Sequence, residues 1–422
     1  METLQRVLLP VAEKLDRNRY LTAIKNGFFV AMPLLIIGSI FLLITQLPIP
    51  PYLAFMKSVL GENWMSIFLK VNSMAMDVMT FYVIFGMAKS LAGFYGIDEG
   101  AGQAASIFAF LILTPVVAVE GANYFPIGNF GAAGLFVGMI TAVLAVEIFR
   151  FIDARGWKIK MPESVPGNVA RSFEALIPIL FVAIIFNFIR LGFEATSYTT
   201  AHNFIFTVLQ QPLLSLGNTL PAMLVIMLLE SLFWSFGLHG SNIVGAVMTS
   251  IWTALTVQNA TAVQAGLAPT NIITSQFYSN FVKIGGSSGT IGLALAAVFF
   301  SKSQQYKTLG KLAIGPAVFN INEPLVFGVP IVLNPIMLIP FIITPLLLTT
   351  ITYLAMSSGI VPLTNGINLP WTMPPIISGF ILSGWQGAAL QVGLIALSFG
   401  IYYPFFKVQD NKAYAIEIGE EE

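Results

Sequence analysis

One carboxylate lies in an apolar, proline-interrupted part of the chain, in the segment Asn320–Leu325. This residue, Glu323, stands out because charged residues make up only 9% of the sequence. An acidic side chain near the middle of a bilayer costs about 2.5–3.5 kcal/mol on the most lenient insertion scale. Because packing does not require such a residue, we predict that Glu323 belongs to a functional site. The alternative is a structural glutamate that is hydrogen-bonded at the tip of a hairpin.

A second group of polar residues follows the apolar run that ends near residue 238. Glu230 and Trp234 are four residues apart, so they share a face on a continuous helix. His239 lies between Gly237 and Gly240, and these glycines favour a break in the helix. An imidazole at such a break can exchange a hydrogen bond with a ligand hydroxyl. The alternative is a histidine that is hydrogen-bonded to backbone near a helix end.

A third polar interruption, residues 365–375, contains Trp371 among asparagine and proline residues. An indole ring can cover the C–H face of a sugar while amides and carboxylates bind the sugar hydroxyls. Trp234 is predicted to do the same from the other side. Both tryptophans also suit a plainer role as anchors at the membrane interface.

The remaining motifs narrow the chemistry. Gly285–Thr290 is glycine-rich, but it lacks the spacing and strand–helix setting of a P-loop, so we expect a tight turn. Lys283 either reaches the membrane interface or pairs with a buried carboxylate. The sequence has no cysteine and no cluster of metal-ligand residues, and we expect neither a metal nor a cofactor. Its polar residues suit a neutral, hydroxyl-rich solute better than an ion or a lipid.

The composition indicates the fold that must position these residues. Hydrophobic residues make up 56% of the chain, and its 9% charged content falls well below the roughly 25% of soluble domains. We therefore predict an all-α integral membrane protein. It is expected to lie in the lipid bilayer and not to bind nucleic acid. The apolar runs are Gly27–Leu47, Met74–Tyr95, Gly102–Val119, Phe130–Phe149, Phe173–Phe193, Leu220–Leu238, Ile284–Phe300, Ile331–Met356 and Ile376–Phe406.

Lysine and arginine positions predict the orientation. They collect before the first run and in the 150–172 loop, whereas residues 195–218 are uncharged. The positive-inside rule therefore places the amino terminus and the 150–172 loop in the cytoplasm, with five crossings up to about residue 193. Residues 195–218 are then an external loop, in which His202 has no expected role. No cleaved signal peptide is visible, and the first residues predict an amphipathic interfacial helix on Leu4, Val7, Leu8, Val11 and Leu15.

The later part of the chain contains interrupted segments. Residues 240–258 and 312–330 are short and rich in Gly, Pro and Asn, which predicts re-entrant or broken pieces surrounded by protein or a water-filled cavity. We predict about ten transmembrane helices plus two re-entrant hairpins. We expect regular helices over residues 1–194 and the buried polar groups in residues 195–422. Broken helices near the midplane are where transporters hold their substrates.

Four motifs resemble one family. Met161–Pro178 and Asn322–Pro335 are similar to the fifth-span entry and the glutamate signature of enzyme IIC, the membrane subunit of the bacterial sugar phosphotransferase system. The similarity is to its lactose/cellobiose/diacetylchitobiose branch. Gly237–Gly240 and Gly285–Ser287 fall in the order that this family shows.

This resemblance implies a disaccharide permease of the bacterial plasma membrane, for diacetylchitobiose or cellobiose. It also implies a homodimer of ten-span protomers, in which residues 1–194 form most of the interface and residues 195–422 enclose the sugar. A phosphocysteine of a IIB subunit, which works with a IIA subunit, would phosphorylate the sugar 6-hydroxyl. The chain has no cysteine, so IIB must be a separate chain.

The resemblance also assigns roles by position. Glu323 would lie beside the 6-hydroxyl and His239 would contact the sugar nearby, and these two are the expected catalytic residues. The implied substrate-binding residues are Trp234, His239, Asn242, Asn322, Glu323 and Trp371.

Two other functions fit the residues. In a proton-coupled secondary sugar transporter, Glu323 would carry the proton and Lys283 or His239 would relay it. A sensor would bind sugar in the cavity without translocating it.

Overall fold

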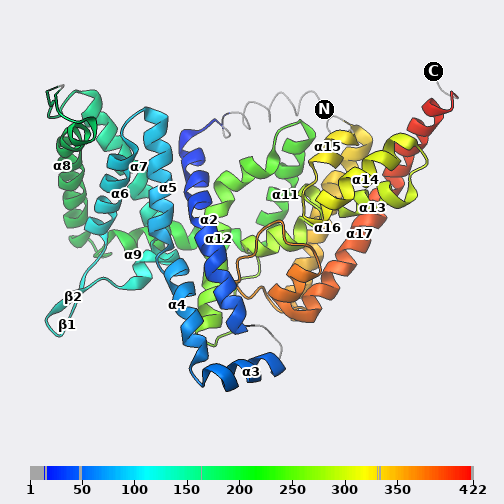
Figure 1. Ribbon diagram of the computed structural model, residues 1–422, viewed down its shortest axis with the longest axis horizontal. Helices are drawn as coiled ribbons and strands as arrows, with labels where there is room; N and C mark the ends of the chain where they lie inside the picture. The colour runs from blue at the N-terminus through cyan, green and yellow to red at the C-terminus, as the bar shows by residue number, and fades with distance from the viewer. Residues whose placement is uncertain are drawn as a thin grey trace.

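The computed structural model describes residues 14, 17–46, 50–162, 164–329, 331 and 334–419. Within these residues the regular structure is helical apart from one antiparallel hairpin of β1 (Val117–Val119) and β2 (Ala122–Tyr124) (Figure 1). The prediction of an all-α membrane fold is therefore confirmed. The predicted interfacial helix rests on Leu4, Val7, Leu8, Val11 and Leu15, which lie outside the described residues.

The first half of the chain forms a helical bundle in which α7 packs against α5, α6 and α8. Glycines bring helices close together: a Cβ on Gly86 of α5 would lie 2.9 Å from the Cα of Gly27 on α2. The five predicted crossings correspond to α2, to α4 with α5, and to α6, α7 and α8. The elements are α2 (Arg19–Gln46), α3 (Pro50–Leu60), α4 (Trp64–Met76), α5 (Met79–Tyr95), α6 (Glu99–Leu113), the 3₁₀ turns η1 (Ile127–Phe130) and η2 (Ala132–Gly134), α7 (Leu135–Ala154) and α8 (Gly167–Glu194).

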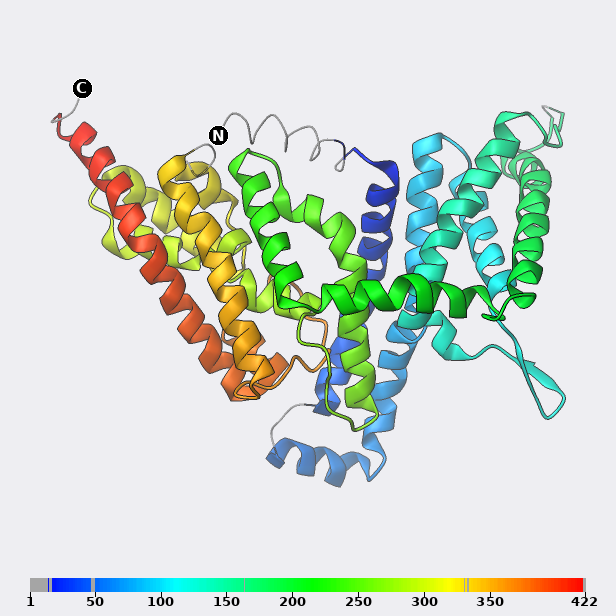
Figure 2. The same cartoon turned by 180° about the vertical axis from the view of Figure 1, so that it is seen from behind.

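Residues 201–217 are helical, so the prediction of a loop over residues 195–218 is wrong for most of that segment. This segment comprises α9 (Ala201–Ile205), the π-helical turn η3 (Phe206–Gln210) and α10 (Gln211–Gly217). It runs sideways from the bundle to α11 (Leu220–Ser235), which continues at an angle of 75° (Figure 2). His202 is buried, with a ring nitrogen 3.2 Å from the Thr114 hydroxyl. A lack of charge here reflects packing against the bundle.

A second correction concerns residues 240–258. They form a continuous helix, α12 (Gly240–Gln264), and not a re-entrant hairpin. In the most apolar stretch of this helix, which is long enough to cross a membrane, 72% of the residues are buried inside the protein. Its polar residues bind protein partners instead of breaking the helix: Thr256 donates to the Trp252 carbonyl, and Asn259 donates to two loop carbonyls. The polar residues of this segment therefore indicate a helix buried inside the protein and not an interrupted one.

The interruptions lie further along the chain. The π-helical turn η4 (Phe277–Val282) and the 3₁₀ turn η5 (Ser287–Gly289) lead into α13 (Ile291–Phe300) through a 55° bend. The predicted break within residues 312–330 is present, because four residues separate the end of α14 (Gln304–Val318) from the start of α15 (Glu323–Gly328). Two long helices complete the chain, α16 (Pro335–Ser357) and α17 (Ile377–Glu417), and residues 358–376 form the loop between them.

Within the described chain, seven helices are long and apolar enough to cross a membrane, or nine if each of the two bent pairs counts as one span. The fifteen-residue α6, one of the predicted crossings, falls short of that length. The bent pairs are residues 201–235 and 277–300, and neither coincides with the hairpin predicted over residues 240–258.

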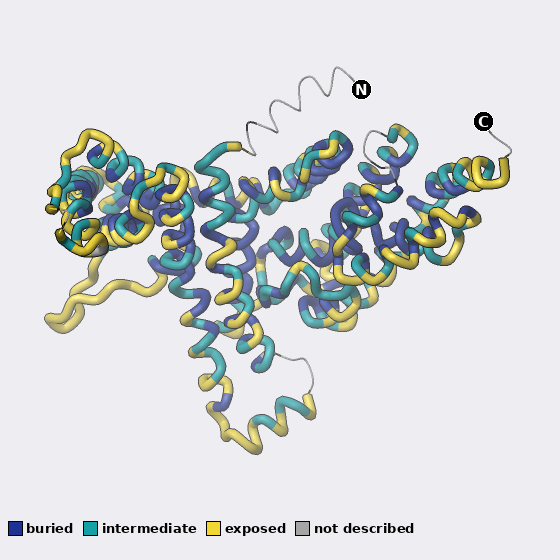
Figure 3. The backbone as a smooth tube through the Cα atoms, turned by 45° about the horizontal axis from the view of Figure 1, so that its top comes forward, coloured by how far each residue is buried: buried dark blue, intermediate teal, exposed yellow. Residues whose placement is uncertain are grey.

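Exposed and buried residues are distributed as a lipid-embedded protein requires. Figure 3 shows exposed residues along the β-hairpin and along α3, neither of which has a buried residue. Large apolar side chains such as Phe188 and Phe299 are about 70% exposed on the outer faces of their helices. The buried polar residues gather in the second half of the chain, around α12, η4 and the α14–α15 break.

Candidate functional site

A cavity of about 350 Å³ lies where α2, the start of α12, the η4–η5 segment, the α14–α15 break and the 358–376 loop meet. Its volume falls within the range of small-molecule sites. Five of the six predicted substrate-binding residues line it. The lining is Lys25, Phe28, Phe29, Met32, His239, Ser241, Asn242, Gly245, Thr249, Tyr278, Ser279, Lys283, Ser287, Asn320, Asn322, Glu323 and Trp371.

Glu323 and His239 face each other in this cavity. The Nε2 atom of His239 lies 3.9 Å from Oε1 of Glu323, and each side chain is nearly half exposed. An oxygen atom placed between them can lie about 2.8 Å from both, which is hydrogen-bond distance. Glu323 is the first residue of α15 and precedes Pro324, where the backbone N–H groups favour a negative charge.

Local structure fixes the orientation of the His239 ring. His239 is the residue before the first turn of α12, and its Nδ1 accepts a hydrogen bond from the backbone N–H of Asn242 at 3.3 Å. In a neutral imidazole only one nitrogen carries a proton. Because Nδ1 is the acceptor, the proton lies on Nε2, on the side of Glu323.

Two asparagines hold the segment before Glu323 in place. Asn320 accepts from the Gly285 N–H at 2.8 Å and donates to the carbonyls of Trp371 and Met373. Asn322 donates to the Ser287 carbonyl at 2.8 Å and to the Thr290 hydroxyl at 2.9 Å. These bonds connect the carboxylate to the glycine-rich turn and to the loop that carries Trp371.

The glycine-rich turn itself is tight, as its sequence predicts. Gly286 has a φ of 103°, and a Cβ there would lie 2.4 Å from Asn322 Cγ. Ser287 faces the cavity, and its hydroxyl lies 2.8 Å from that of Ser241. Only glycine fits this close approach of the two interrupted segments.

A buried ion pair lies behind one wall of the cavity. Lys283 Nζ lies 3.5 Å from Oε1 of Glu230, whose side chain is 3% exposed. Glu230 also accepts hydrogen bonds from Ser241 and Tyr278, each at 2.6 Å. Of the two roles considered for Lys283, the structure supports pairing with a buried carboxylate. Glu230 itself was not among the predicted site residues, although it is the one charged residue in the apolar run of residues 220–238.

The two tryptophans differ in position. Trp371 is half exposed and lines the cavity. Trp234 is buried behind His239, with 4.4 Å between the two ring centroids, and its Nε1 donates to Ser241 at 3.3 Å. The expectation that Trp234 lines the pocket is therefore not met. Because the chain turns at Gly237, its indole faces the start of α12, where it supports the His239 ring.

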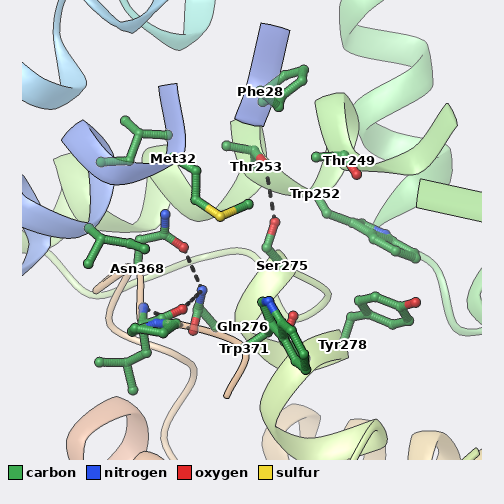
Figure 4. A pocket seen from close by; sticks show the side chains of 15 residues that line it. Phe28, Met32, Thr249, Trp252, Thr253, Ser275, Gln276, Tyr278, Asn368 and Trp371 are labelled. Carbon is green, nitrogen blue, oxygen red and sulfur yellow. Dashed lines mark hydrogen bonds between the residues drawn. The ribbon is translucent and has the colours of Figure 1, made fainter. Parts of the chain in front are cut away.

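A smaller cavity of about 150 Å³ adjoins the first and shares Phe28, Met32, Thr249, Tyr278, Ser279 and Trp371 with it (Figure 4). Its polar residues include Gln276 and Asn368, which are hydrogen-bonded to each other at 2.7 Å. Neither residue was a sequence candidate. Gln276 precedes the π-helical turn η4 and Asn368 lies in the loop after α16, so their proximity depends on the tertiary fold.

Comparisons with known proteins decide the family. A profile described as "Phosphotransferase system, EIIC" matches residues 25–345. This chain belongs to the EIIC family. It is 43% identical to the cellobiose-specific EIIC component of Geobacillus stearothermophilus and 42% identical to the lichenan permease IIC component of Bacillus subtilis. Each alignment covers 97% of this chain and 94% of the relative.

A solved EIIC structure has the same fold as this chain. The crystal structure of the transporter ChbC, the IIC component from the N,N'-diacetylchitobiose-specific phosphotransferase system, superposes with a TM-score of 0.95 at 42% identity. The match covers 99% of both chains. The lactose-specific EIICB component of Staphylococcus aureus is 32% identical, and the chain covers 73% of its length.

These matches show that the chain is a multi-pass IIC sugar permease of the lactose/cellobiose/chitobiose branch. Family membership implies a sugar substrate and IIB and IIA partners. Among the described residues no group of three or more His, Asp or Glu side chains could hold a metal ion.

Proposed function

We propose that this protein carries a β-linked disaccharide, cellobiose or diacetylchitobiose, into the cytoplasm and presents its 6-hydroxyl to the phosphocysteine of a separate IIB subunit. The observation that carries this proposal is the Glu323–His239 pair, which faces a polar cavity across 3.9 Å. Relatives named for cellobiose and diacetylchitobiose, at 43% and 42% identity, support this class of sugar.

The pair has suitable chemistry for presenting a hydroxyl. Phosphoryl transfer requires a positioned nucleophile, charge stabilisation and an acceptor for the nucleophile's proton. In our proposal the sugar O6 accepts a hydrogen bond from Nε2 of His239 and donates one to Glu323. As O6 attacks the phosphorus and the S–P bond of the phosphocysteine breaks, the hydroxyl proton passes to the Glu323 carboxylate. Trp371, half exposed at the junction of the two cavities, would cover one face of a sugar ring.

We also propose the orientation and assembly. Lysine and arginine at the start of α2 and in the 150–172 loop support a cytoplasmic amino terminus. The exposure of α8 supports a homodimer formed through residues 1–194. In the most apolar stretch of this helix, only 17% of the residues are buried inside the protein. Such a face is available to lipid or to a second copy.

Glu323→Gln tests the proposed function. It keeps the shape of the side chain and removes the proton acceptor. In proteoliposomes with phosphorylated IIB, we expect the variant to bind the disaccharide and to phosphorylate it about 100-fold or more slowly than the wild type. Asn218→Ala, which removes a half-buried amide just after α10, outside the cavity lining, is the control for general damage.

The same experiment separates group translocation from proton-coupled transport. Unmodified sugar inside the vesicles, with uptake driven by a pH gradient and independent of IIB, would refute the proposal and favour a proton-coupled transporter. Phosphorylation at the wild-type rate in Glu323→Gln would refute the role of the carboxylate.

A further inference from the structure

The cavity that holds Glu323 and His239 also contains a fixed cation. Lys283 lines the wall, and its side chain is 18% exposed. Its ammonium group donates to the Ser241 hydroxyl at 2.8 Å and to the Tyr278 hydroxyl at 3.3 Å. These bonds use two of its three N–H groups. The third N–H makes no hydrogen bond within the described residues, since Glu230 Oε1 at 3.5 Å is an ion-pair partner only, and it is available for an acceptor that enters the cavity.

Glu230 keeps this cation in place from behind the wall. It does not line the cavity, and its two carboxylate oxygens accept from Ser241 and Tyr278, the same hydroxyls that Lys283 contacts. Removing one member of a buried pair leaves an uncompensated charge, which is strongly unfavourable. The ammonium group is thus held in place by residues behind it, while Lys283 itself lines the cavity.

The reaction needs positive charge at this place. A phosphoryl group that approaches the sugar brings negative charge next to the Glu323 carboxylate, and the two repel each other. Enzymes that transfer phosphoryl groups compensate such charge with fixed cations and hydrogen-bond donors. Two lysines line the cavity, Lys25 on α2 and Lys283. Within the described residues, hydrogen bonds hold the ammonium group of Lys283 in place.

We propose that Lys283 is a catalytic residue that binds the transferring phosphoryl group and afterwards the 6-phosphate of the product. This inference rests on the proposed function. The bond between O6 and phosphorus forms as the S–P bond of the IIB phosphocysteine breaks, and the thiolate of IIB takes the electron pair. The hydroxyl proton passes to Glu323. Lys283 keeps its protons throughout and donates a hydrogen bond to a phosphoryl oxygen.

The opposing interpretation is that Lys283 only neutralises Glu230. Three variants separate the two: Lys283→Met, Lys283→Arg, and the double variant Glu230→Gln/Lys283→Met. The double variant removes both charges together, so it restores electrical balance to the wall and keeps the shape of the acidic side chain. It does not restore a cation to the cavity.

Two measurements are made on the full-length chain. The first is the single-turnover rate of phosphorylation by phosphorylated IIB at saturating cellobiose or diacetylchitobiose, whichever the wild type binds more tightly. The second, without IIB, is the Kd of that sugar and of its 6-phosphate. We expect Lys283→Met to slow phosphorylation by about 100-fold. The Kd of the 6-phosphate should rise by about tenfold while the Kd of the sugar stays within about threefold.

The double variant should remain as slow as Lys283→Met, and Lys283→Arg should recover part of both losses. Recovery of the wild-type rate by the double variant would overturn the proposal, because Lys283 would then matter only to Glu230. Equal weakening of the sugar and its 6-phosphate by Lys283→Met would also overturn it. If Lys283→Met does not fold, the double variant and Lys283→Arg decide the question.

The failure of this inference is distinguishable from failure of the proposed function. A wild-type protein that does not phosphorylate any of these sugars with IIB contradicts the proposed function. A wild type that phosphorylates normally, together with variants unchanged in rate and in 6-phosphate binding, contradicts the role of Lys283 alone.

Discussion

At the scale of single residues, the two nitrogens of His239 contact different partners. Nδ1 accepts from the backbone at the start of α12, and Nε2 faces Glu323. The ring is therefore a hydrogen-bond donor toward the cavity and the carboxylate is an acceptor. A sugar hydroxyl between them would be oriented in one direction, with its oxygen toward His239 and its proton toward Glu323.

Substitutions of His239 can separate these two contacts. Asparagine is a good helix N-cap, whereas alanine at a capped position costs about 0.5–2 kcal/mol of stability. We expect His239→Asn to unfold at nearly the wild-type temperature but to bind the disaccharide about tenfold more weakly, the loss for one hydrogen bond. Thermal unfolding in detergent and titration calorimetry would measure the two effects. His239→Ala should show both losses, and wild-type sugar affinity in His239→Asn would contradict the assignment.

One argument identified Glu323 from the sequence, and the same argument applies to Glu230. Each is a carboxylate within apolar sequence. Glu230 was not assigned to the site because its partner Lys283 is far away in the chain, and only the fold shows that Ser241 and Tyr278 join them. Trp234 was placed wrongly for a related reason, since the turn at Gly237 decides which way its ring faces.

At the scale of elements, two interrupted segments position the carboxylate. The η4–η5 turn and the α14–α15 break contact each other through Asn320 and Asn322. The sequence predicted the second break because Asn and Pro cluster there. It did not predict that α12 is continuous, because Asn and Thr residues that bind carbonyls inside the protein look, in sequence, like those that interrupt a helix.

Gly286→Ala tests this contact between segments. The added Cβ would lie 2.4 Å from Asn322 Cγ, and the φ of 103° is unfavourable for alanine. We expect the segment with Glu323 to shift, which should lower the phosphorylation rate about 100-fold, as misplaced catalytic groups do. Gly393→Ala on α17 is the matched control, because a Cβ there meets nothing within 4 Å. Equal activity of the two variants would show that the close approach does not position Glu323.

At the scale of the whole molecule, both parts of the chain build the cavity. Residues 195–422 were expected to enclose the sugar, but Lys25, Phe28, Phe29 and Met32 of α2 also line it. α2 packs against α4 and α5 in the bundle and against α12 on the cavity side. A sugar in the cavity would therefore contact both parts. Single-sequence patterns gave the helical crossings of the bundle, but this meeting of α2 with α12 depends on long-range packing.

The most direct test of the central claim is a binding cycle between the sugar 6-hydroxyl and Glu323. Cellobiose or diacetylchitobiose and its analogue lacking the 6-hydroxyl on the residue to be phosphorylated would be titrated into the wild type and Glu323→Ala. A hydrogen bond to a charged group contributes about 1.5–3 kcal/mol, so we predict at least about tenfold weaker binding of the analogue to the wild type. In Glu323→Ala the difference between the sugar and the analogue should be at least about tenfold smaller than in the wild type, because only the hydrogen bond from His239 to the hydroxyl remains. The same loss in both proteins would contradict the account, because the hydroxyl would then be bound elsewhere.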